Sequence, residues 1–232
     1  MCGRFALEAD WIELVDAFDL VRVNDPPPVE PRYNIAPTQP ILAVREAEGG
    51  RRAVFLRWGL VPPWVKDPND FPTLINARAE TAAEKPSFRS AMRHGRVLVP
   101  ASGFYEWRSE GKGKPKQPFY IRPREGGLVG FGGLAERWTG PDGEEMASGA
   151  IVTTGPNGTF GKLHDRMPLV VPPDRYAAWL DVRGTVAQEV ADMLVPPDED
   201  FWEAVPVDRA VGNPRAQGPE LVEEIEGVEP AF

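Results

Sequence analysis

The chain has 232 residues, 42% hydrophobic and 26% charged, which is typical of a folded globular protein and excludes wholesale disorder. It has no run of eighteen apolar residues and no signal-peptide pattern after Met1, so we expect a cytoplasmic protein with no membrane contact. A single cysteine, Cys2, excludes an internal disulfide, and with two histidines besides we expect no metal and no cofactor. The formal net charge of −9, taken alone, argues against nucleic acid.

The charge is unevenly distributed along the chain. Residues 1–120 carry 17 basic and 15 acidic side chains, whereas residues 121–232 carry 9 basic and 20 acidic ones. Within residues 76–124 there are 11 basic against 4 acidic side chains. Because salt screens charges over about 8 Å, a local basic surface can persist on an acidic protein. A solvated surface with no partner is the simpler alternative.

The first half of the chain predicts one helix and one hairpin. Residues 8–19 place Trp11, Ile12, Leu14, Val15 and Phe18 at helical spacing. A proline-rich loop follows and runs into residues 32–37. Two short apolar runs around Gly49 and Gly50 predict a hairpin, and the Pro- and Gly-containing segment after it predicts a loop; these are residues 41–45, 53–58 and 58–64.

The second half predicts mostly strands. We expect an extended segment at 74–76, short helical pieces at 81–83 and 87–92, strands at 96–100, 103–107, 118–122, 128–134 and 148–153, and helices at 173–180 and 185–194. The acidic segment from about residue 219 is expected to be peripheral. The sequence therefore predicts one mixed α+β domain over residues 1–232, with an antiparallel, strand-rich, barrel-like core and peripheral helices.

Cys2 is the first candidate for chemistry. Removal of Met1, which a small second residue permits, leaves a free α-amine beside the thiol. The amine has a pKa of about 7.7–8.0, so a useful fraction is neutral and nucleophilic at pH 7. With an aldehyde, the amine forms a Schiff base and the thiol closes on the same carbon, giving a thiazolidine. The alternative is a small buried residue at a chain end.

Three further polar residues lie in apolar or small-residue surroundings. Strand alternation puts Glu106 on the face of Phe104, where its pKa would be raised and suited to proton transfer; the alternative is exposure on an edge strand. Asn76 could bind an amine or a sugar hydroxyl, although capping the following helix is the better interpretation for this residue alone. His164 could act as acid or base or be satisfied within its loop.

Each of these four residues is followed two positions later by an arginine. In an extended segment, residues i and i+2 share one face about 6.6 Å apart. This spacing would pair each reactive group with a cation, at about the distance that separates neighbouring groups along a phosphodiester chain. The arginines are Arg4, Arg78, Arg108 and Arg166.

Eight sequence blocks in order resemble the SOS-response-associated peptidase (SRAP) family, the abasic-site-processing proteins. The resemblance runs from Met1 to about Leu221 and encloses all four candidate residues. The blocks are MCGRF (1–5), RYNIAPTQ (32–39), RWGLVPPW (57–64), INARAET (75–81), VLVPASGFYEW (97–107), GGLAERW (132–138), LHDRMPLVV (163–171) and NPRAQGPEL (213–221).

The resemblance implies a DNA-damage protein that crosslinks through Cys2 to abasic sites in single-stranded DNA and shields them from cleavage. It implies that Asn76 positions the sugar or amine, that Glu106 is the acid/base, and that His164 assists imine formation and reversal. Phosphate contacts would come from Arg4, Arg78 and Arg166, and base contacts from Pro40, Trp64 and Trp107. Peptidase activity would remove Met1, and lyase-like Schiff-base chemistry would serve the DNA reaction.

We expect such a protein to be a monomer associated with the nucleoid. Two other functions remain open. The chain could be an N-terminal-nucleophile amidohydrolase, similar to a class II glutamine amidotransferase domain, in which Cys2 attacks an amide. It could also be a non-catalytic single-stranded DNA-binding protein that uses arginine and tryptophan.

Overall fold

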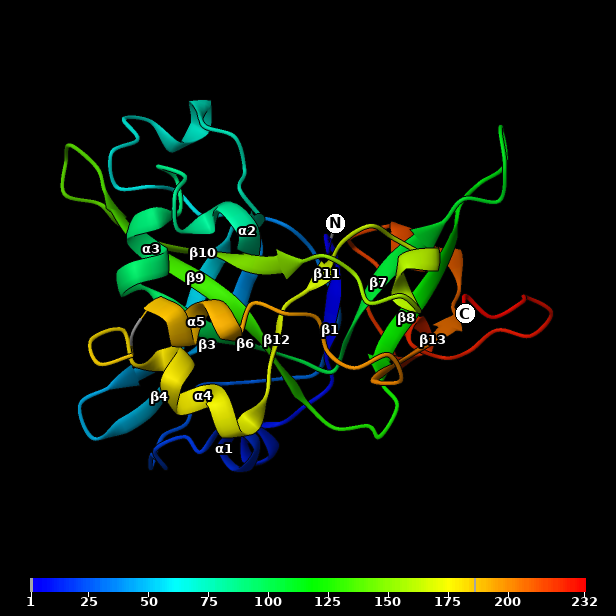
Figure 1. Cartoon of the computed structure of the whole chain (residues 1–232), viewed down its shortest axis with the longest axis horizontal. Helices are drawn as coiled ribbons and strands as arrows, with labels where there is room; N and C mark the ends of the chain where they lie inside the picture. Colours follow the sequence, from blue (N-terminus) through cyan, green and yellow to red (C-terminus); the bar gives the residue numbers. More distant parts are fainter. Residues whose placement is uncertain (1, 186) are drawn as a thin grey trace.

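The computed structural model describes residues 2–185 and 187–232. Its main feature is a closed barrel made of β3 (Pro40–Ala47), β4 (Gly50–Trp58), β6 (Arg96–Ala101), β9 (Val129–Thr139) and β10 (Glu145–Thr154) (Figure 1). Each strand pairs with two neighbours, in the circular order β10, β4, β3, β6, β9 and back to β10. The expected barrel-like core is confirmed.

The barrel is antiparallel except where it closes. Strands β3 and β4 form the expected hairpin, with Ala47 opposite Gly50 and a turn in which Gly49 has a φ of 84°. Strand β10 then runs parallel to β4 at Ser148 and Gly149. It also runs parallel to the short strand β5 (Asn76–Arg78) further along. A parallel contact needs a long connection, so periodicity in the sequence does not predict it.

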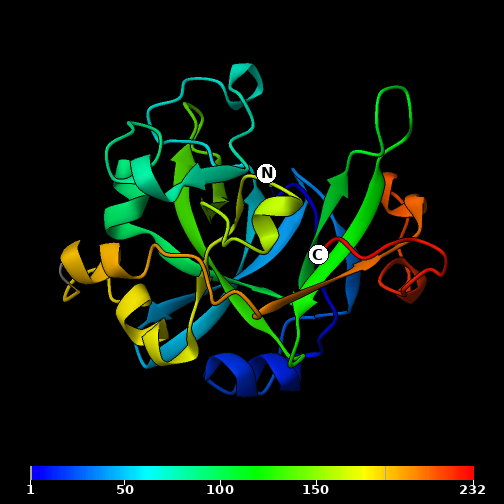
Figure 2. The ribbon, with the colours of Figure 1, turned by 45° about the vertical axis from the view of Figure 1, so that its right-hand side comes forward.

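A second sheet of five antiparallel strands lies beside the barrel (Figures 1 and 2). It consists, in spatial order, of β13 (Trp202–Pro206), β8 (Gln117–Pro123), β7 (Gly103–Arg108), β1 (Phe5–Leu7) and β2 (Arg32–Ile35). Strands β6 to β10 confirm the strands expected in this part of the chain. Strands β2 and β13 were not predicted, because both are short and are defined by partners far away in the sequence.

Aromatic side chains join the two sheets. Phe5 of β1 lies edge-on to Trp58 of the barrel, with ring centroids 5.2 Å apart. Phe104 of β7 meets Phe131 of β9 in the same way at 6.0 Å. All four side chains are buried, and such edge-to-face pairs add to the stabilisation from apolar burial. The N-terminal residues before β1 therefore start at the junction between barrel and sheet.

Within residues 2–185 and 187–232, five short helices lie around the strands: α1 (Trp11–Phe18), α2 (Ala79–Ala82), α3 (Arg89–His94), α4 (Tyr176–Leu180) and α5 (Ala187–Asp192). Helix α1 begins at a reciprocal cap between Asp10 and Glu13, which explains why it starts later than residue 8. Single 3-10 turns occur at Pro68–Asp70, Phe160–Lys162, Pro173–Arg175, Arg209–Gly212 and Pro219–Leu221. None of the helices within the described residues has the length and hydropathy needed to cross a bilayer.

The later segments differ in detail from expectation. The helix expected at 173–180 is a 3-10 turn followed by α4, and the one expected at 185–194 is α5; Val186, within it, lies outside the described residues. The acidic C-terminal tail, residues 219–232, returns to the sheet: Leu221 is buried, and the ring of Phe232 lies 6.4 Å from that of Phe160. Short strands β11 (Met167–Pro168) and β12 (Val170–Val171) complete the structure.

Candidate functional site

Cys2 is buried immediately before β1. Its carbonyl oxygen accepts a hydrogen bond of 2.9 Å from Nδ2 of Asn76. Burial raises the pKa of the Cys2 thiol well above its ordinary value, and the nearby Glu106 carboxylate raises it further. The thiol is therefore protonated at neutral pH in this state.

Asn76 opens β5, where it lies opposite Ile151 of β10. Helix α2 begins only at Ala79, and its N-cap residue is Arg78, with no capping side-chain hydrogen bond. The interpretation of Asn76 as a helix cap is therefore wrong: its amide binds Cys2 instead. Its Oδ1 is buried and has no hydrogen-bond partner among the described residues. A buried amide oxygen without a hydrogen-bond partner can accept a hydrogen bond from an N–H or O–H group of a bound molecule.

Glu106 lies in β7, between β1 and β8, so the edge-strand alternative is wrong. It is 5% exposed and stands opposite Phe119. Alternation along β7 puts Glu106 on the same face as buried Phe104, as predicted, while Tyr105 joins a separate cluster with Tyr120. Burial raises the pKa of Glu106 to about 7, which lets this carboxyl both give and take a proton near neutral pH.

His164 lies in the loop between β10 and β11, residues 155–166, which we call the His164 loop. Its Nε2 is 3.9 Å from Oε2 of Glu106, and its Nδ1 accepts a 3.0 Å hydrogen bond from the backbone N–H of Arg166. The hydrogen bond within the loop is confirmed, and the acid/base role of His164 stays a prediction. Partial burial lowers the pKa of the ring, which favours its neutral form.

These contacts bring four distant segments of the chain together. Asn76 donates a hydrogen bond to the carbonyl oxygen of Cys2, the charge of Glu106 raises the pKa of the Cys2 thiol, and Glu106 lies 3.9 Å from His164. The cluster combines a thiol, an amide, a carboxyl of raised pKa and an imidazole. Such a set can hold a carbonyl compound and move protons around it. Within the described residues, no three His, Cys, Asp or Glu side chains are grouped so as to hold a metal ion.

Arg4, two residues after Cys2, is half-buried. Its Nη1 donates to Oδ1 of Asn34 at 2.8 Å and to the carbonyl oxygen of Val211 at 2.7 Å. Its guanidinium lies 5.9 Å from the ring centroid of Trp107, which is half-buried too. Arg4 and Trp107, both expected at DNA, are therefore neighbours.

The other three arginines of the i+2 pattern have different surroundings. Arg78 is exposed at the end of β5. Arg108 pairs with Glu110 at 2.9 Å, and its Nη1 donates to carbonyl oxygens of the C-terminal tail at Glu229 and Pro230. Arg166 binds both carboxylate oxygens of Glu80, at 2.7 and 3.0 Å. Because the His164 loop turns back on itself, the extended geometry assumed for the pattern does not apply at Arg166.

Trp64 and Pro40 are exposed. Trp64 is 57% exposed, with its ring edge-on to Phe71 at 5.6 Å, and Pro40 starts β3. The basic residues of 76–124 do not share one surface: α3 lies on the barrel side, whereas the turn between β7 and β8, with three lysines, projects from the other sheet (Figure 1). A linear count of charge therefore does not define a binding surface here.

Sequence reasoning missed two polar residues that bind the candidate arginines Arg4 and Arg166. Asn34 is fully buried; besides accepting from Arg4, its Nδ2 donates to the carbonyl oxygens of Asn213 and Ala216 at 2.9 and 3.0 Å. Glu80 holds Arg166. Both lie inside the sequence blocks quoted above, but an asparagine in a strand and a glutamate at a helix start are too common to be singled out without their partners.

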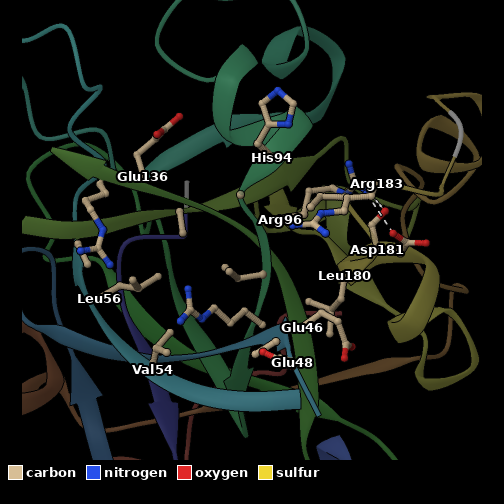
Figure 3. Close-up of a pocket in the computed structure, with 18 of the residues that line it drawn as sticks. Glu46, Glu48, Val54, Leu56, His94, Arg96, Glu136, Leu180, Asp181 and Arg183 are labelled. Atoms are coloured by element: carbon tan, nitrogen blue, oxygen red, sulfur yellow. Dashed lines mark hydrogen bonds between the residues drawn. The ribbon is translucent and has the colours of Figure 1, made fainter. Parts of the chain in front are cut away.

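A separate pocket lies elsewhere in the structure. It has a volume of about 980 Å³ and opens at the end of the barrel, where residues of all five barrel strands line it (Figure 3). Arg96 and Leu180 lie on one side of it, with Leu56 and Glu136 across from them (Figure 3). None of the four clustered residues lines it. The candidate chemistry therefore lies at the junction of barrel and sheet, away from this pocket.

A closed barrel joined to a second sheet, with Cys2 held beside an amide, a carboxyl and an imidazole, defines a protein with a candidate N-terminal nucleophile. The profile of the SOS response associated peptidase (SRAP) family matches residues 1–214. The chain belongs to this family.

Relatives match over most of the chain. Abasic site processing protein YoqW of Bacillus subtilis is 38% identical over 96% of this chain and 99% of its own length. Abasic site processing protein YedK of Escherichia coli is 36% identical over 97% of this chain and 100% of its own. Among solved structures, a phage-related protein of Bordetella bronchiseptica superposes with a TM-score of 0.71 at 29% identity, covering 90% of this chain and 95% of that one. A Bacteroides thetaiotaomicron protein shares the fold with a TM-score of 0.86 at 24% identity, covering 97% and 100% of the two chains.

Proposed function

We propose that this protein processes abasic sites by crosslinking to them in single-stranded DNA through Cys2. The observation that carries the proposal is the convergence of Cys2, Asn76, Glu106 and His164 at one junction of the fold. The names of the relatives, abasic site processing proteins, support the same substrate. The crosslink would shield the site from strand cleavage during repair in the cytoplasm.

The reaction needs the α-amine of Cys2, so it starts with removal of Met1, which we propose is autocatalytic. The amine attacks the aldehyde carbon of the ring-opened sugar, and loss of one water gives a Schiff base. The thiol sulfur then adds to the imine carbon while its proton passes to the imine nitrogen. The product is a thiazolidine, and the sum of the steps releases one water.

The order of the steps follows from the surroundings of Cys2. Burial keeps the thiol protonated, so the amine attacks first and the thiol closes the ring second. Glu106, with a pKa of about 7, supplies and accepts the protons of ring opening and dehydration. His164, 3.9 Å from Glu106, assists imine formation and reversal. The unpartnered Oδ1 of Asn76 accepts a hydrogen bond from the amine or a sugar hydroxyl.

For the DNA strand we propose phosphate contacts at Arg4, Arg78 and Arg166, and base contacts at Pro40, Trp64 and Trp107. Exposure supports Trp64 as a stacking platform, since base–aromatic stacking contributes about 1–3 kcal/mol per base. A monomer suffices for this function, because all the proposed residues belong to one chain.

Arg78→Gln should weaken DNA binding and should make the binding constant less sensitive to salt concentration. Each phosphate contact on a single strand contributes about 0.7 to the slope of log K against log salt concentration, so losing one should reduce the slope by about that amount. The measurement is a salt titration of binding to an oligonucleotide without an abasic site. Arg89→Gln, an equal charge change at an exposed position of α3, is the control and should leave the slope unchanged. Equal slopes for both variants would show that Arg78 touches no phosphate.

The function itself is tested by incubating the protein with single-stranded DNA treated with uracil glycosylase. The proposal predicts an adduct that survives heating in denaturant and is absent with undamaged DNA. Glutaminase activity without any adduct would instead support the amidohydrolase alternative. Salt-sensitive binding without an adduct would support the non-catalytic alternative.

A further inference from the structure

The ion pair between Glu80 and Arg166 has the geometry of a fixed structural contact. Nη1 and Nη2 of Arg166 each donate to one carboxylate oxygen of Glu80. This bidentate geometry is the strongest arrangement for an arginine–carboxylate pair. The Arg166 side chain is only 13% exposed, whereas Glu80 is 53% exposed. Glu80 therefore lies on the solvent side and covers the guanidinium.

This ion pair connects the two segments that carry Asn76 and His164. Glu80 is in the first turn of α2, directly after β5, which begins with Asn76. Arg166 is the last residue of the His164 loop, and its Nη2 also donates to the carbonyl oxygen of Thr153 at the end of β10. Through Arg166, Glu80 is thus connected both to the end of β10 and to the end of the His164 loop.

The contact reaches the imidazole through the backbone of Arg166. The backbone N–H of Arg166 donates to Nδ1 of His164 at 3.0 Å, and the Asp165 carboxylate lies 3.0 Å from the same nitrogen, so the position of Arg166 helps to set the position of the ring. The other half of the loop is held independently, by Glu199, whose two carboxylate oxygens accept from the backbone N–H groups of Gly158 and Thr159. Loss of the Glu80 contact should therefore loosen the part of the loop near His164 and leave the rest in place.

We propose that Glu80 is a positioning residue, which through Arg166 holds His164 in register with Asn76 and Cys2. This inference rests on the proposed function and extends it to a residue outside the reacting cluster. Because Arg166 is also a proposed phosphate contact, the test measures DNA binding and crosslinking separately.

The test compares Glu80→Gln with Glu84→Gln, an equal charge change at an exposed residue five positions before Arg89. At saturating abasic DNA, we expect the single-turnover crosslinking rate of Glu80→Gln to fall about tenfold, because a small misplacement of a reacting group has effects of this size. The dissociation constant of undamaged DNA should change by less than about twofold. Glu84→Gln should match the wild type in both.

Two further measurements separate this proposal from failure of the proposed function. Amide hydrogen exchange without DNA should be faster across residues 162–166 in Glu80→Gln and unchanged in Glu84→Gln, whether or not any adduct forms. Arg166→Lys should slow crosslinking as much as Glu80→Gln, and the double variant should be no slower than either single one. Unchanged exchange, multiplicative rate losses, or tighter DNA binding by Glu80→Gln would each overturn the proposal.

Discussion

Cys2→Ala will form no heat-stable adduct with abasic single-stranded DNA. The reason is chemical: alanine keeps an α-amine once Met1 is removed, but it has no sulfur to close the ring on the imine carbon. The wild-type adduct should survive heating, whereas any Schiff base of the variant should hydrolyse. The expected loss is complete on a denaturing gel, the largest effect of any substitution in the protein.

Non-covalent binding separates loss of chemistry from loss of folding. Cys2 is buried but small, so alanine leaves little space unfilled, and the variant should bind undamaged DNA as the wild type does. Borohydride, which reduces an imine, should trap the variant on abasic DNA if Met1 has been removed. A heat-stable adduct formed equally by Cys2→Ala would show that another nucleophile reacts, and the thiazolidine would have to be abandoned.

Glu106→Gln will slow crosslinking by about a hundredfold, the lower end of what a positioned proton donor and acceptor contributes. Glutamine is nearly the same size as glutamate and fits the same buried position, but it cannot exchange a proton. The measurement is the single-turnover rate at saturating DNA. Glu110→Gln is a matched control, because Glu110 lies just beyond β7 and pairs with Arg108 at 2.9 Å. A rate within about twofold of wild type would remove Glu106 from the mechanism.

The same substitution should stabilise the protein at high pH. The pKa of Glu106 is about 7 in the folded protein against an ordinary 4.5, so between these values the folded state holds a proton that the unfolded chain has released. Stability therefore falls as the pH rises from about 4.5 to about 7, by up to about 3 kcal/mol. Glu106→Gln lacks this loss and should melt at a higher temperature than wild type at pH 8, with the difference shrinking toward pH 4. A difference that does not depend on pH would contradict the raised pKa.

Local pattern predicted much of the fold, and its limits have physical reasons. Helix α1, the β3–β4 hairpin and strands β6 to β10 follow from apolar periodicity and turn residues, which act over short distances. The closure of the barrel cannot be predicted in this way. It depends on the parallel pairing of β10 with β4, which joins Ser148 to Arg57, and these residues lie far apart in the sequence. The short strands β2 and β13 are likewise defined by partners remote in sequence.

The candidate site shows the same division. Glu106 was predicted to share a buried face with Phe104, since strand alternation is local, and its burial is observed. For Asn76 the sequence favours a helix cap, because the actual partner of its side chain, the Cys2 carbonyl, is 74 residues away. Glu80 gave no signal at all until its ion pair with Arg166, 86 residues away, was visible. The sequence gives the type of each residue in the site, but it does not show which side chains are paired with one another in the fold.

Intact mass measured before and after incubation with abasic single-stranded DNA tests the central claim most directly. We predict that the purified protein lacks the Met1 residue, and that reaction adds the mass of the oligonucleotide less one water. Fragmentation should place the added mass on Cys2. A protein that reacts while keeping Met1, an adduct that retains the water, or an added mass on another residue would contradict the thiazolidine at Cys2.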